Sequence, residues 1–313
     1  MVTYRQSGVN IDAGNKLVSI IKKVAPSVGG FSGLYPVKGT NVMLAASSDG
    51  VGTKLKLAFL LKKHDTVGID LVAMNVNDLV CCGARPAFFL DYFSCGKLDI
   101  RIAAQVIKGI KKGCDQAGCL LLGGETAEMA GFYKQGEYDL AGFAVGTLRR
   151  NEMITGKGVR PGDVVIGLPS SGPHSNGFSL IRRVFSGRDL RRYGRQLLAP
   201  TRIYVKDVFS MPLKSVRGMA HITGGGFYEN IVRSIPANCG VVIRKNSWKV
   251  QDIFRIIRKK GKVSEKEMHR VFNMGIGMAV ITAPSAAARC VKAVRGARVI
   301  GEVTGGRREV RVI

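Results

Sequence analysis

The sequence has 313 residues, 46% of them hydrophobic, with 40 glycines and 10 prolines. This length and composition predict a soluble α/β protein with two domains and a sizeable core. No apolar run reaches the ~18 residues of a membrane span, and the N-terminal residues lack the apolar core of a signal peptide. We therefore expect a cytoplasmic protein with no membrane partner.

The formal charge of +26 is unusual, and residues 151–313 carry 30 of the 48 basic residues but only 10 of the 22 acidic ones. The positive electrostatic field of such a protein attracts nucleic acid, anionic membranes or anionic metabolites. The basic residues are scattered, with few aromatics between them, and no nucleic-acid module is recognisable. An enzyme with anionic ligands is favoured, and nucleic-acid binding stays open. The seven cysteines form no C-x-x-C pair, so neither a zinc site nor a disulfide framework is indicated.

A polar, glycine-punctuated segment opens the chain and leads into a helix predicted at residues 16–24. The glycine-rich residues 29–33 follow and suit either a loop that closes over a nucleotide or a plain connector. Next comes S-S-D-G-V-G-T-K at residues 47–54, between an apolar run at 42–46 and a helical pattern through Leu55, Ala58 and Leu61.

The 47–54 stretch therefore predicts a strand, a glycine turn and a helix. Glycines let backbone N–H groups approach a phosphate, and a helix start favours negative charge. The Walker spacing is absent, which excludes an ordinary P-loop ATPase. A purely structural turn is the alternative.

Residues 68–79 read as a helix that places Asp70, Asn77 and Asp78 on neighbouring parts of one face. Carboxylate and amide oxygens suit Mg²⁺, which takes a few carboxylates plus phosphates. The alternative is a solvated face with Asp70 as N-cap.

The remainder of the first half continues the pattern of strands and helices. A strand is predicted at 87–93, a helix from the N-cap Asp99 to Gly118, a strand at 119–122 and a strand at 138–148. The stretch G-G-E-T-A-E-M at 123–129 reads as a second glycine-carboxylate turn. Charge and glycine cluster at 150–158, and we place the domain boundary there, giving domains 1–154 and 155–313.

The second half opens with a strand at 164–168 and the loop S-S-G-P-H-S-N-G at 170–177, which precedes a helix at 178–184. His174 in this loop is a candidate donor or general acid or base, although a loop histidine often has neither role. A basic linker at 187–196, a third glycine loop H-I-T-G-G-G at 221–226, a helix at 252–260 and β structure from 276 onward complete the prediction. The whole pattern indicates an α/β or α+β fold.

These motifs together resemble the aminoimidazole ribonucleotide synthetase family, also called phosphoribosylformylglycinamidine cyclo-ligases. Besides the stretches above, the resemblance rests on S-G-V-N-I-D-A-G-N, H-D-T-V-G-I-D-L-V-A-M-N-V-N-D-L, Y-D-L-A-G-F-A-V-G, L-A-P-T-R-I-Y-V-K and F-N-M-G-I-G-M, which follow in order from about Tyr4 to Glu302. It implies a two-domain fold whose N-terminal mixed sheets join across a homodimer. It also implies an ATP- and Mg²⁺-dependent ring closure of formylglycinamidine ribonucleotide in purine biosynthesis.

The resemblance also assigns candidate site residues. Those for the metal are Asp49, Asp70, Asp78 and Glu125, and those for the nucleotide are Asp12, Gly50, Gly52, Thr53, Lys54, Gly123 and Gly124. Those for the substrate are Ser171, Gly172, His174, Asn176, Thr223, Gly224, Gly225 and Gly226, and the catalytic set is Asp49, Lys54 and His174. Another enzyme of the same ATP-using superfamily, or a basic nucleic-acid-binding relative without activity, is the alternative.

Overall fold

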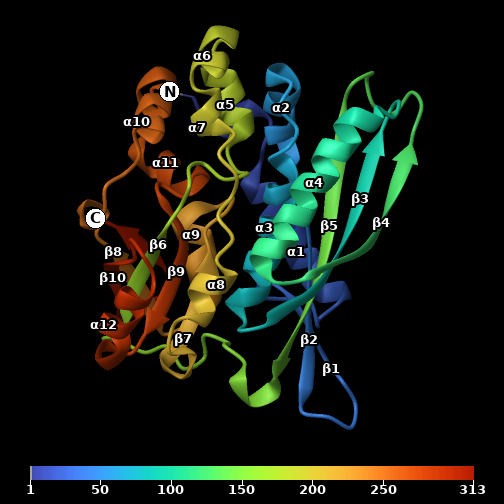
Figure 1. The fold of residues 1–313 in the computed structure, drawn as a ribbon. Helices are drawn as coiled ribbons and strands as arrows, with labels where there is room; N and C mark the ends of the chain where they lie inside the picture. Colours follow the sequence, from blue (N-terminus) through green and yellow to red (C-terminus); the bar gives the residue numbers. More distant parts are fainter. Residues whose placement is uncertain (1) are drawn as a thin grey trace.

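The computed structural model describes residues 2–313, which form two β-sheets with their own helices (Figure 1). The first sheet has the order β1-β2-β5-β3-β4 and the second the order β11-β8-β10-β6-β9-β7. The last strand of the first sheet ends at Arg149 and the first strand of the second begins at Val164. Among these residues no helix is long and apolar enough to cross a membrane.

The first sheet consists of β1 (Gly33–Pro36), β2 (Val42–Gly50), β3 (Arg85–Cys95), β4 (Leu120–Glu128) and β5 (Tyr138–Arg149). All neighbouring pairs are antiparallel except β3 and β4, which are parallel and joined by α4 (Ile100–Ala117). The other helices are α1 (Ile11–Val24), α2 (Leu55–Leu61) and α3 (Val67–Cys81). The predicted α/β class with a mixed N-terminal sheet is confirmed.

Helix α3 carries apolar side chains on every face, and all but one of its residues are buried. It packs against the first sheet, α4 and strand β7 of the second domain, which explains why no polar face is needed. Gly68 permits the close approach to α4, since a Cβ there would lie 2.3 Å from the Ile110 nitrogen. Helix α3 is therefore a buried helix that packs against elements of both domains.

The second sheet consists of β6 (Val164–Pro169), β7 (Val216–His221), β8 (Cys239–Ile243), β9 (Ile276–Thr282), β10 (Arg298–Gly305) and β11 (Val310–Val312). Its helices are α5 (Phe178–Val184), α6 (Gly187–Arg192), α7 (Gly194–Leu197), α8 (Val205–Phe209), α9 (Gly226–Asn230), α10 (Asp252–Gly261), α11 (Glu265–Val271) and α12 (Pro284–Ala293). Strand β9 is buried throughout and pairs with β6 and β7.

Three predicted elements were wrong in detail. Strand β2 runs on through Gly50 because residues 47–50 continue to pair with β5, so the turn is shorter than expected. The glycine-carboxylate stretch at 123–128 is strand rather than turn, because its backbone pairs with β3. The basic segment at 187–196 forms α6 and α7, where Ser186 and Asp189 make a capping box.

Candidate active site

Two carboxylates meet where β2 ends against α3. Asp49 stands on β2 and Asp78 on α3, and the backbone N–H of Gly50 donates to Asp49 Oδ1 over 2.7 Å. Burial, with a further contribution from the negative charge of Asp78, raises the pKa of Asp49 to about 6. Two neighbouring carboxylates that repel each other fit a divalent cation, which would relieve that repulsion.

His221, at the end of β7, brings the second domain to this acid pair. Its Nδ1 lies 2.9 Å from Asp78 Oδ1, and its Nε2 lies 3.4 Å from the amide Nδ2 of Asn77. The amide donor at Nε2 leaves the Nδ1 proton for Asp78. Sequence reasoning did not select His221, although it opens the glycine stretch H-I-T-G-G-G directly after a strand.

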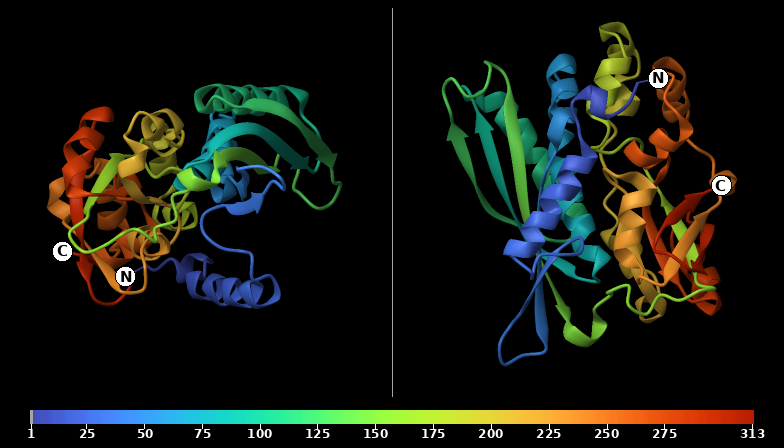
Figure 2. Two further views of the ribbon diagram at one scale, coloured as in Figure 1. Left: turned by 90° about the horizontal axis from the view of Figure 1, so that it is seen from below. Right: turned by 180° about the vertical axis from the view of Figure 1, so that it is seen from behind.

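A cavity of about 970 Å³ lies beside the acid pair, between α1 and the first sheet. Figure 2 shows α1 lying apart from the sheet that it faces. Asp78, Ser47 and Ser48 line the cavity, and so do the cations Arg233 and Arg308. The glycine-rich residues 29–33 line it as well. Acid, hydroxyl and basic groups in one cavity suit a metal-bound polyphosphate.

Lys54 and Asp70 differ from the expected phosphate and metal ligands. Lys54 Nζ lies 2.8 Å from Asp70 Oδ1, and both side chains are fully buried. The same oxygen accepts from Thr201 N and Oγ1 and from Ser175 Oγ, while Lys54 Nζ also donates to Ala199 O. The two residues join the first domain to loops of the second, so neither reaches a bound ligand in this arrangement.

His174 is also placed differently from the expected acid or base. It is fully buried with φ +61°, and its Nε2 accepts from the backbone N–H groups of Ser171 and Arg202. Burial, aided by nearby positive groups, lowers its pKa well below the usual value. A neutral ring that accepts two backbone N–H groups holds the 170–177 loop in shape.

The two candidate substrate loops contact each other. Asn176 Oδ1 accepts from Gly224 N over 3.1 Å, and the Asn230 amide donates to the carbonyls of Thr223, Gly224 and Gly226. Gly226 has φ +57°, and a Cβ there would lie 1.9 Å from His269 O, so this turn requires glycine. The Nδ2 of Asn176 is buried and has no partner among the described residues, which leaves its two N–H donors for a ligand.

Helix α1 is tied to α9 and α11 by an ion pair and a hydrogen bond. Asp12, an expected nucleotide ligand, pairs with Arg270, which also contacts Glu229. Asn15 donates to the same Glu229 from the next turn of the helix and lines the cavity. The structure therefore places Asp12 as an anchor of α1.

The remaining candidates lie around the domain junction or on β2. Ser171 Oγ donates to Pro200 O, Gly172 O accepts from the Asn273 amide, and Thr53 Oγ1 lies 3.2 Å from Ser179 Oγ. Gly50 ends β2, and Gly52 follows it with φ +67°.

Glu125, Gly123 and Gly124 do not join Asp49 within one chain. In the sheet register, Asp49 lies opposite Gly142, Gly142 opposite Asp91, and Asp91 opposite Gly124. Three strand spacings of ~4.8 Å therefore separate Asp49 on β2 from Gly124 on β4 by roughly 14 Å. The expected convergence of Asp49, Asp78 and Glu125 in one chain is wrong, because β5 and β3 lie between them. Within residues 2–313, no group of three or more His, Cys, Asp or Glu residues is placed to hold a metal.

Family models match both halves of the chain. Residues 32–148 match the AIR synthase related protein, N-terminal domain, and residues 160–313 match the AIR synthase related protein, C-terminal domain. The chain is thus an AIR synthase related protein.

Curated relatives identify the particular family. The chain is 51% identical to phosphoribosylformylglycinamidine cyclo-ligase of a Thermoanaerobacter species, over 96% of this chain and 97% of the relative. It is 51% identical to the chloroplastic enzyme of Arabidopsis thaliana, over 97% of this chain and 82% of that one. The chain belongs to the phosphoribosylformylglycinamidine cyclo-ligase family, and the family and enzyme class expected from the sequence are confirmed.

Solved structures of more distant proteins share the fold. AaThiL complexed with AMPPCP and TMP superposes with a TM-score of 0.67 at 19% identity, covering 95% of this chain and 92% of that one. A chain of the HypE-HypF complex gives 0.69 at 14% identity, covering 95% of both chains. These similarities show the architecture.

Proposed function

We propose that this protein closes the imidazole ring of aminoimidazole ribonucleotide, using ATP, in purine biosynthesis. The γ-phosphoryl group of ATP is transferred to the formyl oxygen of formylglycinamidine ribonucleotide. An amidine nitrogen then attacks the activated carbon, and the C–O bond to phosphate breaks. The products are aminoimidazole ribonucleotide, ADP and phosphate. The family relationship supports the reaction, and the observation that carries the site is the Asp49–Asp78 pair beside a cavity with basic walls.

Asp49 and Asp78 are the residues that would hold Mg²⁺. The ion, when bound, neutralises charge on the phosphoryl oxygens, and it takes one or two carboxylates plus phosphates rather than a full protein cage. His221 donates to Asp78 and fixes the direction of that carboxylate. Asp78, with Asp49 beside it, thus forms an anionic end of the cavity whose direction His221 fixes.

The cations of the cavity would bind the nucleotide phosphates. Arg233 and Arg308 line the same cavity as Asp78, and Gly50, Gly52 and the hydroxyls of Ser47 and Ser48 lie at the end of β2. Arginine forms strong charge-assisted hydrogen bonds with phosphate. The substrate would contact the loops of Asn176 and residues 223–226, and Asn15 of α1 reaches Glu229 in the helix that follows the second loop. Lys54, Asp70 and His174 act through the loops they hold.

We further propose a homodimer in which Glu125 acts in the site of the partner subunit. Strand β4 exposes apolar side chains on an uncovered edge, with Leu120 68% and Leu122 62% accessible. An uncovered apolar strand edge of this kind is a surface for pairing with another chain. Strand β2 is uncovered beyond Ala46, where its pairing with β1 ends, and pairing of β4 with that edge of β2 in the partner subunit would bring Gly123, Gly124 and Glu125 next to Asp49 of the other subunit.

A cytoplasmic location is part of the proposal. It is tested by cell fractionation, and recovery of the protein with a membrane or organelle fraction would contradict it.

The test of the proposed function supplies purified protein with ATP, Mg²⁺ and formylglycinamidine ribonucleotide. We expect one aminoimidazole ribonucleotide for each ADP, and no product when any of the three is omitted. Formation of ADP without the imidazole product would show another kinase of the same fold. No turnover, together with steep salt-dependent binding to DNA, would support the nucleic-acid alternative.

A further inference from the structure

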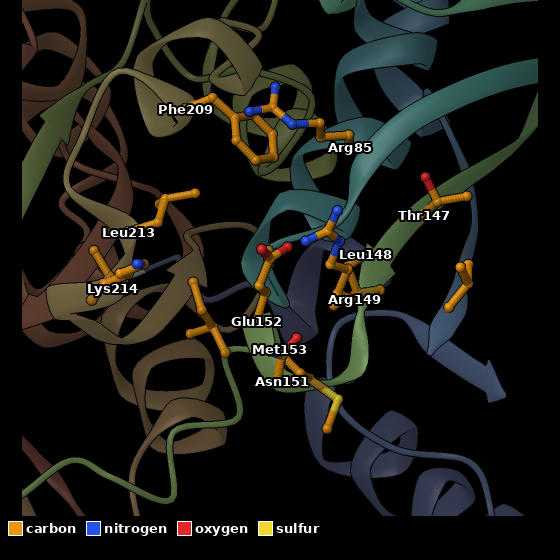
Figure 3. A pocket seen from close by; sticks show the side chains of 14 residues that line it. Arg85, Thr147, Leu148, Arg149, Asn151, Glu152, Met153, Phe209, Leu213 and Lys214 are labelled. Atoms are coloured by element: carbon orange, nitrogen blue, oxygen red, sulfur yellow. The ribbon is translucent and has the colours of Figure 1, made fainter. Parts of the chain in front are cut away.

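A second cavity, of about 950 Å³, lies between the two domains beside the segment that links them (Figure 3). Its walls come from the ends of β3 and β5, from residues 151–154, and from α8 and the 3₁₀ turn Leu213–Ser215 of the second domain. None of its lining residues lines the cavity beside Asp78. It is therefore a separate site that nothing in the proposed reaction uses.

Three cations line this cavity without an ion-pair or hydrogen-bond partner among the described residues. Arg85, Arg149 and Lys214 line it, and among residues 2–313 none of these side chains makes an ion pair or a hydrogen bond. By contrast, Arg202 pairs with Asp207 and Arg217 with Asp163. The only acid in the lining is Glu152. The cavity thus has a surplus of positive charge that suits an anion.

Arg85 is held in place without the use of its N–H donors. Its guanidinium carbon lies 3.8 Å from the centroid of the Phe209 ring, a contact between the two domains that Figure 3 shows. A guanidinium fixed on one face by an aromatic ring keeps its edge donors free and can stack a planar group on its other face.

The rest of the wall is largely apolar. Leu148, Met153, Leu213 and Val216 line the cavity, together with the polar Thr147, Asn151 and Glu152. An inorganic anion would contact only the basic groups, and the volume falls in the usual range of ~300–1,000 Å³ for sites of small organic ligands. The ligand that matches both surfaces has an anionic group and a planar ring.

We propose that this interdomain cavity binds a nucleoside monophosphate. Arg149 and Lys214 contact the phosphate, and the base lies against Arg85 and the apolar wall. Because the cavity draws on both domains and on the linking segment, the ligand bridges the two domains and resists their relative movement.

The test is calorimetric titration with AMP of the full chain saturated with AMPPCP, so that any ATP site is already filled. We expect one AMP per chain. Binding should weaken at least tenfold in Arg149→Ala/Lys214→Ala, because two charge-assisted contacts are lost. The matched control is Lys157→Ala/Lys206→Ala, which removes the same charge from exposed positions outside the cavity and should bind as the native protein does.

Adenosine and inorganic phosphate, titrated separately, should each bind at least tenfold more weakly than AMP. Thermal unfolding midpoints of both double variants, equal to that of the native protein, show that they are folded. Absence of AMP binding, or equal binding by native protein and Arg149→Ala/Lys214→Ala, would overturn the proposal. Binding of phosphate as tight as that of AMP would reduce the cavity to an anion site and overturn the nucleotide assignment.

Discussion

The ammonium group of Lys54 lies 2.8 Å from the carboxylate of Asp70, and both side chains are withdrawn completely from solvent at the junction of the domains. Asp70 receives donors from Thr201 and Ser175 of the second domain on the same oxygen. The Lys54–Asp70 pair therefore links the two domains, and its loss should lower the stability of the folded protein.

Asp70→Asn should destabilise the protein by about 3–5 kcal/mol, because it leaves the buried charge of Lys54 without its partner. Urea unfolding measures this change. The control is Asp65→Asn, which removes a surface ion pair with Lys63 and should cost less than about 1 kcal/mol. Equal effects of the two variants would contradict the role given to Asp70.

Asp49→Asn should separate stability from activity. In the folded protein the pKa of Asp49 is about 6, above the 3.8 of the unfolded chain, so the folded protein binds this proton more tightly. The free energy of unfolding therefore falls as the pH rises from about 4 to about 6. Above pH 6 the native carboxylate stays ionised beside Asp78 at a cost that asparagine does not carry. The variant should be about 1–3 kcal/mol more stable than native protein at pH 8 and nearly equal at pH 4.

The same variant should lose at least a hundredfold in kcat, because a metal-binding carboxylate is gone. Chemical unfolding at pH 4 and pH 8, with initial rates at pH 8, checks both parts. A variant that is less stable at pH 8, or one that keeps its turnover, would remove Asp49 from the site.

Arg233→Ala should raise the KM for ATP about tenfold or more, since a charged hydrogen bond to phosphate contributes about 1.5–3 kcal/mol. Arg233 lines the cavity beside Asp78, whereas the exposed Arg307 does not. Arg307→Ala should leave the KM unchanged. Steady-state rates at varied ATP compare the two, and identical values would place the nucleotide elsewhere.

Mixed subunits test whether Glu125 acts across the dimer. Asp49→Asn and Glu125→Gln should each be nearly inactive alone. In a refolded equal mixture, half of the dimers are heterodimers, and each has one site with both native carboxylates, so activity should return to about a quarter of the native value. No recovery, with heterodimers shown by native mass spectrometry, would mean that Glu125 does not serve the partner's site.

Local signals in the sequence were sufficient for several elements. Helix α4 was predictable because Asp99 caps its start and Gly118 ends it with φ +70°. The strand around Glu125 was not predictable in this way. Its glycines favour a turn locally, but pairing with β3, which is distant in sequence, makes the stretch a strand.

The candidate site shows the same limit. The spacing of Asp70, Asn77 and Asp78 located the correct helix, since α3 carries all three. It did not show that Asp70 and Asn77 face the second domain, where they meet Thr201 and Tyr204, while Asp78 meets His221. These contacts join residues more than a hundred positions apart, and no periodicity encodes them. The boundary at residues 154 and 155 stays a prediction.

Transfer of oxygen from substrate to phosphate tests the central claim most directly. Formylglycinamidine ribonucleotide labelled with ¹⁸O in the formyl group is converted with ATP and Mg²⁺ in unlabelled water, and the phosphate is examined by mass spectrometry. The proposed phosphorylation of the formyl oxygen predicts one ¹⁸O in each phosphate released. Unlabelled phosphate, with ¹⁸O recovered in water, would contradict it.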